Sequence, residues 1–493
     1  MVSQIKQQRQ VQAIVNSLGD RRTADQLIKD MFFYSISNEV EELGLKIGEE
    51  LTENQRLALT EDLVWLVKET IEIDGKVETI LVPRVYLASA TIAMLRGNDS
   101  LSGSVVKAGN DINVTAGDIR GNYGSFNAGN NLRISASNNI KLTDIKFNAL
   151  KDINISAGRM VDIRSMARSA GLSVTPLRSA ASTGSVKDEA IAARSIFNAG
   201  SDILISSAGD IAIDTDQINS GGSLFFNALN NITNNSRNVR AANLVSMDAG
   251  NDIINDGGTI EAGSFVYLTA GRDIVNRSST NKQSFANGDK SESIKSRGEI
   301  IGRDVVLVSG RDIVNEGSDI RAVDEIYLEA GGDVDIRATA IENISTNRIH
   351  RGYERTHTIK HTGSNLTAGD KLTIISAADT RLTGSSASAA NDISINSGGS
   401  FTEQSVSDYS HYEKQWSKKR RAGGKKTYRI ERTNITQQAA QLPSTSGNIN
   451  VASGDDINVI ASDIKAMSGD VNLSTSDEVN ILSGVNYQRE FFS

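Results

Sequence analysis

Apolar and polar positions along most of this chain repeat with a period of about 21 residues. A short phrase marks each period: a small residue, Gly, a polar residue, Asp or Asn, and then Ile or Val. Around the phrase, apolar residues alternate with polar ones, which is the period of a β-strand. A unit of this length cannot bury a hydrophobic face by itself, so it has to stack on its neighbours. Copies of the phrase begin at Ala108, Ala249, Ala270, Ala330 and Ser453.

We call the Asp or Asn of the phrase the anchor. Counting residues from the anchor assigns each apolar position to a column, which is a set of residues that occupy the same place in successive units. The anchors are expected at residues 231, 252, 273, 312 and 333 and then at Lys371 and Asp392. Three short strands in each unit predict one turn of a parallel β-helix, with identical columns about 4.8 Å apart. The predicted fold class is therefore all-β, a parallel β-helix (solenoid) over residues 98–485. One column contains Ile232, Ile253, Ile274, Ile313 and Val334, and another contains Leu224, Val245, Val266, Val305 and Ile326.

One column carries Asn where an aliphatic residue is expected, three residues after the anchor. Stacked Asn side chains can hydrogen-bond to one another along parallel strands. Asn is also common in turns, where it tolerates a left-handed backbone. We favour an inward ladder, because a buried amide needs partners and the stack supplies them. The residues of this predicted structural ladder are Asn234, Asn255, Asn276 and Asn315.

The first hundred residues lack the repeat. Apolar residues at helical spacing predict a helical segment over residues 1–50, and the Thr52…Gln55 pattern predicts a further short helix. Alternating residues on both sides of Asp74-Gly75 predict a β-hairpin. Residues 51–97 are thus expected to form a short helix and a hairpin. This segment fits either a cap over the open end of the solenoid or a spacer between two rods.

Composition agrees with a solenoid and narrows its chemistry. The 493 residues include 3 Pro, 42 Gly and no Cys, which suits short strands with tight turns and excludes disulfides and thiolate metal sites. A net charge of −8 disfavours nucleic-acid binding by the shaft. The sequence contains no run of 18 apolar residues, so no transmembrane segment is expected.

The coils around residues 108–158 and 221–338 resemble haemagglutinin repeats, as in Ala270-Gly271-Arg272-Asp273-Ile274. The block from Leu51 to Leu87 is similar to a segment of the same exoproteins, which are filamentous haemagglutinin and the contact-dependent growth inhibition effectors. The resemblance implies a right-handed β-helix, a two-partner outer-membrane transporter as partner, and a secreted or bacterial surface location. The secretion domain and the toxin domain of that pattern are missing, so an internal fragment or a split reading frame is expected.

Three insertions interrupt the repeat, at residues 278–300, 343–364 and 402–443. Specific binding is expected in them, because solenoids often bind through such insertions. The third is strongly basic, and Gly423-Gly424 predicts the turn of a projecting hairpin. Its cations and aromatics can bind acidic glycans, anionic lipids or phosphates, or they are simply a solvated loop. The candidate ligand-binding residues are Trp416, Lys418, Lys419, Arg420, Arg421, Lys425, Lys426 and Tyr428.

No catalytic, cofactor or metal site is predicted. Carboxylates such as Asp252 and Asp312 recur once in each coil, which is typical of turn residues and not of a catalytic pair. His357 and His361 share one side of a strand, but a zinc site needs three or four ligands. We expect a non-enzymatic adhesin shaft that attaches to a receptor or glycan on a host or neighbouring cell, or presents a distal domain. The alternatives are the delivery region of a contact-dependent toxin and a polysaccharide-active enzyme.

Overall fold

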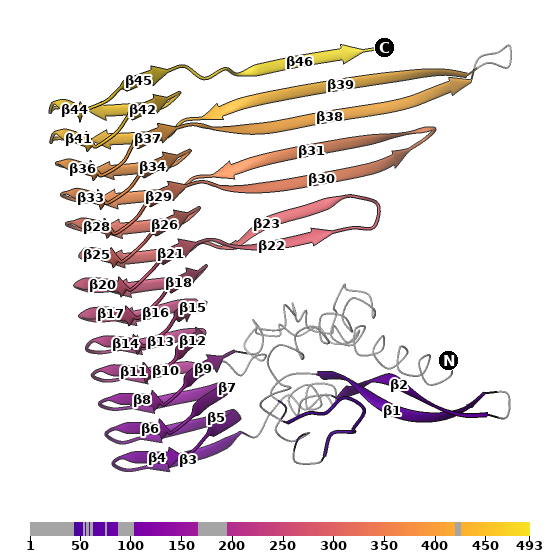
Figure 1. Cartoon of the computed structure of the whole chain (residues 1–493), viewed down its shortest axis with the longest axis vertical. Helices are drawn as coiled ribbons and strands as arrows, with labels where there is room; N and C mark the ends of the chain where they lie inside the picture. The colour runs from indigo at the N-terminus through magenta and orange to yellow at the C-terminus, as the bar shows by residue number, and fades with distance from the viewer. Residues whose placement is uncertain are drawn as a thin grey trace, which may run out of the picture.

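Short parallel strands stack in register to form an elongated shaft (Figure 1). A computed structural model describes residues 44–52, 55, 59, 63–73, 76–86, 103–165, 195–419 and 425–493. The elements of these residues are all β-strands, and the shaft strands form three parallel faces. The prediction of an all-β parallel β-helix is therefore confirmed. Of the helical segment expected over residues 1–50, residues 1–43 lie outside the described residues. Residues 44–50 form turns and a bridge from Gly48 to Val67 instead of a helix.

The first face of the shaft is a 13-stranded parallel sheet with one strand in each described coil. Its strands are β4 (Ile112–Ala116), β6 (Leu132–Ala136), β8 (Ile153–Ala157), β11 (Ile203–Ser207), β14 (Leu224–Ala228), β17 (Leu244–Ala249), β20 (Phe265–Ala270), β25 (Asp304–Ser309), β28 (Ile326–Ala330), β33 (Leu372–Ser376), β36 (Ile393–Ser397), β41 (Ile449–Ser453) and β44 (Val471–Thr475).

The second and third faces are joined through β5 (Ile119–Ala128) and β7 (Asn139–Ala149), which run across both. The second face continues with β9 (Met160–Arg164), β12 (Asp210–Asp214), β15 (Ile232–Asn234), β18 (Ile253–Asp256), β21 (Ile274–Arg277), β26 (Ile313–Glu316), β29 (Val334–Arg337), β34 (Thr380–Thr383), β37 (Phe401–Gln404), β42 (Ile457–Ile460) and β45 (Val479–Leu482). The third face contains β3 (Ser104–Ala108), β10 (Ile196–Ala199), β13 (Gln217–Ser220), β16 (Asn238–Ala241), β19 (Thr259–Ala262), β24 (Glu299–Gly302), β27 (Asp319–Ala322), β32 (Asn365–Ala368), β35 (Ser386–Ala389), β40 (Gln441–Ser444) and β43 (Asp463–Ala466).

Alternate residues of these strands point inward and form one continuous core along the shaft. The register follows the sequence columns: Ile253 lies beside Ile232 on one side and Ile274 on the other. Near the N-terminal end of the shaft, Phe147 stacks on Phe197 with ring centroids 4.2 Å apart. Each coil covers the hydrophobic side chains of the next, so the stability of the shaft is distributed along its length.

The recurring Asp of the sequence phrase joins successive coils. The Asp252 carboxylate accepts the backbone N–H of Asp273 in the next coil at 3.2 Å, and Asp312 accepts the N–H of Asp333 at 2.9 Å. The partner of each carboxylate thus lies in the next coil and not in its own turn. Since every coil needs this bond, the repetition of Asp has a structural cause.

The phase predicted beyond Asp333 is wrong. Asp379 is the next anchor, because its N–H donates to the Asp333 carboxylate at 3.0 Å. Lys371 and Asp392 lie instead at the corner before the first face, where their carbonyl oxygens accept bonds from the neighbouring coils. The same small-Gly-polar-Asp phrase occurs at both corners. The spacing between phrases therefore assigned residues of the corner before the first face to the corner before the second face.

A fourth interruption was missed in the sequence. Ile203 stacks on Ile153, 50 residues earlier, where the uninterrupted repeat would place a residue 21 positions away. The extra chain lies between β9 and β10 and includes residues 166–194, which are outside the described part. Its Ser- and Ala-rich sequence carries no anchor phrase. The spacing of the anchors therefore did not reveal this insertion.

Three antiparallel hairpins leave the shaft at one corner, between the second and third faces, and form a lateral sheet to one side of the shaft (Figure 1). A final strand pairs with the last hairpin and completes seven strands. The strands of this lateral sheet are β22 (Ser279–Ser284), β23 (Lys290–Ser296), β30 (Thr339–Ile349), β31 (Gly352–Thr362), β38 (Val406–Lys419), β39 (Lys425–Gln438) and β46 (Tyr487–Phe492).

A separate small core surrounds the N-terminal hairpin, β1 (Leu63–Ile73) and β2 (Lys76–Tyr86). Trp65 is buried there and donates its indole N–H to the Lys46 carbonyl at 3.3 Å. Thr52 and Gln55 form reciprocal bonds, with the Thr52 N–H donating to the Gln55 side chain at 2.9 Å. Whether this unit is a cap or a spacer stays a prediction.

Candidate functional site

The lateral sheet brings together segments that are far apart in the sequence. Strands β31 and β38 pair from Gly352 with Trp416 to Ile359 with Tyr409. Both hairpins leave at the same corner of nearby coils, so their strands come within pairing distance. The sequence had indicated separate projecting insertions. The regular alternation and the length of these segments were present in the sequence, but they do not reveal pairing between hairpins.

The far end of the lateral sheet carries aromatic and basic side chains in contact. Trp416 and Tyr428 form a cross-strand pair with ring centroids 5.3 Å apart and planes at 15°. The Lys414 ammonium lies 5.8 Å from the centre of the Trp416 ring. Lys418 and Lys426 lie 5.8 Å and 4.7 Å from the centre of the Tyr428 ring. These cation–π contacts hold three ammonium groups on one side of the hairpin.

Lys418 and Lys426 lie directly opposite each other across the hairpin, and the backbone of Lys419 pairs with that of Lys425. Like charges directly opposite each other destabilise a strand pair. By contrast, Lys414 has a carboxylate partner: its ammonium lies 2.5 Å from Glu354, and this hydrogen bond raises the Lys414 pKa. Among the described residues, no carboxylate forms an ion pair with the side chain of Lys418 or Lys426.

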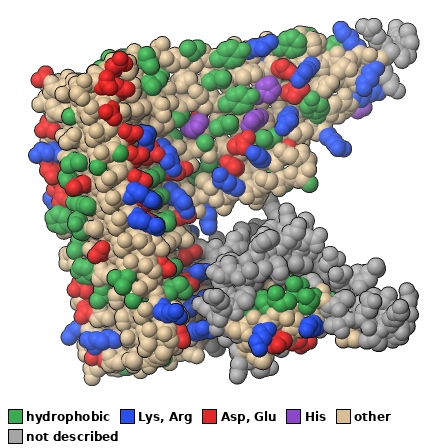
Figure 2. Space-filling view, in the orientation of Figure 1, with side chains coloured by type: hydrophobic (Ala, Val, Ile, Leu, Met, Phe, Trp, Pro, Cys, Tyr) green, Lys and Arg blue, Asp and Glu red, His purple; other side chains and the backbone are tan. Residues whose placement is uncertain are grey.

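These residues define the basic tip, made of Trp416, Lys418, Lys425, Lys426 and Tyr428. Figure 2 shows Lys and Arg side chains gathered toward the far end of the lateral sheet. The Lys419 backbone ends β38, whereas Arg420 and Arg421 lie outside the described residues. The structure thus brings together five of the eight residues selected from the sequence as ligand-binding candidates.

The four Asn residues of the predicted ladder point into the shaft and are almost fully buried. Each amide donates to the next side-chain oxygen: Asn234 to Asn255 at 2.8 Å, Asn255 to Asn276 at 2.7 Å and Asn276 to Asn315 at 2.8 Å. The Asn315 amide donates to the Ser318 carbonyl at 2.9 Å. The four side chains thus form a hydrogen-bonded ladder inside the shaft.

A second Asn ladder, on the outside of the third face, was missed. Asn148 donates to Asn127 at 2.9 Å, Asn198 to Asn148 at 3.0 Å and Asn219 to Asn198 at 3.0 Å. The Asn residues before Ala128, Ala149 and Ala199 were a usable signal, but the insertion of residues 166–194 hid their register.

Three of the four described histidines pair individually with neighbouring strands. His357 lies 2.9 Å from Glu342, His361 lies 3.1 Å from Asp408, and His411 lies 2.9 Å from the Thr433 hydroxyl. Glu342 also bonds to Lys290, whose ammonium lies 2.7 Å away. Within the described ranges, no group of three or more His, Asp or Glu side chains is placed to hold a metal ion.

Glu403 on β37 is the least expected side chain in the shaft. It points into the core between Leu382 and Val459, in the same column as the Asn ladder, and neither carboxylate oxygen has a hydrogen-bond partner. Burial, with a smaller contribution from the negative charge of Asp463, raises the Glu403 pKa to about 8. In the sequence, Glu403 fell inside the predicted insertion 402–443. The structure places it in the last shaft strand before the hairpin.

Residues 346–419 and 422–490 match the family model described as the hemagglutinin repeat. Each match contains one strand of the β38–β39 hairpin together with neighbouring coils of the shaft. These residues therefore carry hemagglutinin repeats. The matched residues lie C-terminal to the coils that showed the resemblance in the sequence.

Several large bacterial proteins are similar to parts of this chain. The tRNA nuclease CdiA of Escherichia coli (strain STEC_O31) is 26% identical over 429 residues, which is 86% of this chain and 12% of that protein. The protein adenylyltransferase and cysteine protease IbpA of Histophilus somni (strain 2336) is 34% identical over 129 residues, 26% of this chain and 3% of that protein. The chain thus spans a small part of these relatives. No solved structure matches it.

Among the described residues, no helix has the length and hydrophobicity needed to cross a membrane.

Proposed function

We propose that this region is a non-enzymatic shaft of a secreted or surface-exposed bacterial adhesin, and that its lateral sheet contacts an acidic glycan on another cell. The observation that carries this proposal is the basic tip. Lysines that face each other without a carboxylate partner repel and destabilise the free protein. A bound polyanion would neutralise their charge and remove this repulsion. Parallel coils hold the lateral sheet well away from the axis of the shaft (Figure 1).

The shaft itself supports a mechanical role. Its recurring carboxylates are engaged with the next coil, as in the Asp273 carboxylate, which bonds Arg311 and accepts the Asp312 N–H at 3.3 Å. The Arg311 guanidinium, together with this N–H, holds the Asp273 pKa below its usual range. A carboxylate engaged in this way is unsuited to general acid catalysis, which needs a raised pKa. An enzyme built on these Asp residues is therefore the least supported alternative.

The match to the hemagglutinin repeat and the similarity to CdiA support an outer-membrane transporter of a two-partner system as the secretion partner, and a place outside the cell. A second candidate function is the delivery region of a contact-dependent toxin. The 26% identity to the tRNA nuclease CdiA over 86% of this chain favours it. In that case the shaft would carry a toxin domain located elsewhere in a longer protein.

Heparin, a highly sulfated glycan, is a suitable probe for the basic tip. We expect the double variant Lys418→Ser and Lys426→Ser to bind immobilised heparin on the order of tenfold more weakly, with elution at lower salt, because counterion release drives such binding. The matched control replaces Lys107 and Lys465 on the third face with Ser, which also removes two exposed lysines. Equal retention of the double variant and the wild type would contradict the proposal, and equal losses in the double variant and the control would show a nonspecific charge effect.

A further inference from the structure

The first face of the shaft carries an apolar strip on its outer surface, on the side away from the lateral sheet (Figure 1). In the middle coils the outward side chains are Leu204, Phe225, Ser246, Tyr267, Val306 and Tyr327, neighbours in successive strands. In the coils at both ends the same column is polar, as in Asn113 and Asn154 near one end and Asn450 and Asn472 near the other. The change is therefore local and is not a property of the fold.

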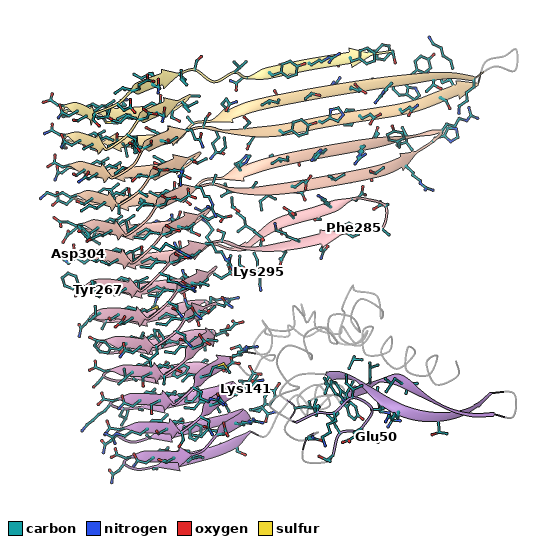
Figure 3. The ribbon with its side chains drawn as sticks, viewed as in Figure 1. Glu50, Lys141, Tyr267, Phe285, Lys295 and Asp304 are labelled. Atoms are coloured by element: carbon teal, nitrogen blue, oxygen red, sulfur yellow. The ribbon has the colours of Figure 1, made fainter. Side chains whose placement is uncertain are left out.

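Aromatic rings occupy every second strand of this strip, at Phe225 on β14, Tyr267 on β20 and Tyr327 on β28. The rings are therefore about 9.6 Å apart along the shaft, twice the spacing of paired strands. Phe265, beside Tyr267 on β20, adds a further exposed ring, with half of its surface accessible. Figure 3 shows Tyr267 at the outer margin of the shaft, away from the hairpins.

Acidic and polar side chains border the strip. Glu329 accepts the Tyr327 hydroxyl at 2.6 Å, which orients that ring along the strand. Asp248, two residues after Ser246, and Asp304, which pairs with Phe265, lie on the same outward side of the sheet. Carboxylates accept hydrogen bonds from hydroxyl groups and repel anions. The surface thus suits a neutral ligand with many hydroxyl groups.

We propose that this aromatic strip, defined by Phe225, Phe265, Tyr267 and Tyr327, binds an extended, neutral β-1,4-linked glycan. In such a chain successive sugar rings are turned over, so every second ring presents the same face to one side. The C–H groups of a sugar face pack against the electron-rich face of an aromatic ring. Aromatics on every second strand match this alternation, and the bordering carboxylates accept the sugar hydroxyls.

This site is independent of the basic tip, because the two lie on opposite sides of the shaft and prefer ligands of different charge. Failure of one proposal leaves the other standing. The alternative occupant of the strip is a second copy of this chain, since flat apolar sheet faces also pack against each other. Sedimentation of the wild type and of Tyr267→Ser distinguishes that outcome.

The test uses the full chain and measures its depletion from solution by chitin and cellulose beads, both neutral β-1,4-linked glycans. We expect the wild type to bind, Tyr267→Ser to bind on the order of tenfold more weakly, and Tyr267→Ser with Tyr327→Ser to lose binding. Ser is present in the same column at Ser246 and Ser394, so the fold tolerates it there. Phe285→Ser is the matched control, because Phe285 is an equally exposed aromatic in the β22–β23 turn (Figure 3).

A second variant tests the spacing by moving one ring by one strand. Ser246→Tyr added to Tyr267→Ser keeps the number of aromatics but breaks their alternation, and we expect binding to stay as weak as in Tyr267→Ser alone. Restored binding would overturn the match to an alternating glycan. The proposal also fails if the wild type binds neither bead, if Phe285→Ser binds as weakly as Tyr267→Ser, or if sedimentation shows a wild-type dimer that Tyr267→Ser dissociates.

Discussion

The shaft and the lateral sheet are both built from β-strands, but they differ in which side chains lie next to each other on paired strands. In the shaft, parallel strands in register put a residue directly over its counterpart in the next coil, as with Asn255 over Asn234. Asn has both a donor and an acceptor, so a stack of Asn satisfies itself. At the far end of the lateral sheet, antiparallel pairing puts Lys418 against Lys426. Lysine only donates, so this pair needs a partner from elsewhere.

The two regions also differ in how they bury their side chains. The shaft encloses a core in which Ile253, Ile274 and Ile313 are at most 1% exposed. The lateral sheet is a single layer, and most of its described side chains are half-buried or exposed. A single layer gains little from the hydrophobic effect, so its position depends on attachment to the shaft. Stability is therefore concentrated in the shaft, whereas the directly opposed lysines lie in the lateral sheet.

The largest expected effect comes from placing a charge in each region at an Ile position. Ile274→Asp in the shaft should lower the free energy of unfolding by about 4 kcal/mol or more, because it buries a carboxylate without a partner. Ile435→Asp, on β39 of the lateral sheet, should cost about 1 kcal/mol, since that position is only half-buried. Urea unfolding monitored by circular dichroism measures both variants. Equal losses would contradict the difference in burial between the two regions.

The next largest effect is a gain in stability, at Glu403. Its pKa of about 8 lies above the ordinary value of 4.5, so folding opposes ionisation of this carboxyl group. The resulting penalty is absent below about pH 4.5, grows as the pH rises, and is complete above about pH 8. Glu403→Gln removes the ionisable group and should stabilise the protein by about 3 kcal/mol at pH 7.

The pH dependence shows whether charge or side-chain packing causes the gain in stability of Glu403→Gln. The advantage of Glu403→Gln over the wild type should shrink to near zero at pH 4, where the wild-type carboxyl group is neutral. Thermal unfolding at pH 4, 7 and 9 measures this difference, with Glu478→Gln as the control, because the Glu478 side chain is exposed. An advantage that stays constant from pH 4 to pH 9 would show that side-chain packing, and not charge, is responsible.

Much of the shaft could be predicted from the sequence, because parallel coils that stack in register repeat the same kinds of residue at a fixed spacing. The columns through Ile274 and Val266 match the pairing of the strands. The phase failed at Lys371, where two corners share one phrase and an insertion removed the local reference. Periodicity therefore predicts which residues point inward, but it does not count the residues in an insertion.

The lateral sheet and Glu403 could not be predicted for a different reason. Pairing of His357 with His411 joins hairpins that are separated by more than a full coil, and no local pattern encodes that contact. Glu403 looked like part of a polar insertion, because a buried carboxylate breaks the hydrophobic rule by which core positions are recognised. The basic composition of the tip was visible in the sequence, whereas the opposition of its lysines required the register.

The smallest of the three expected effects tests the interior ladder against a surface amide. Asn255→Leu removes the acceptor of Asn234 and a donor to Asn276, and leaves buried amide groups without partners. We expect a loss of about 2 kcal/mol, even though Leu382 shows that the same column accepts a Leu side chain. Asn434→Leu on the exposed surface of β39 should change stability by less than about 0.5 kcal/mol. If Asn255→Leu were as stable as the wild type, apolar packing alone would hold these coils together, and the hydrogen-bonded ladder would be dispensable.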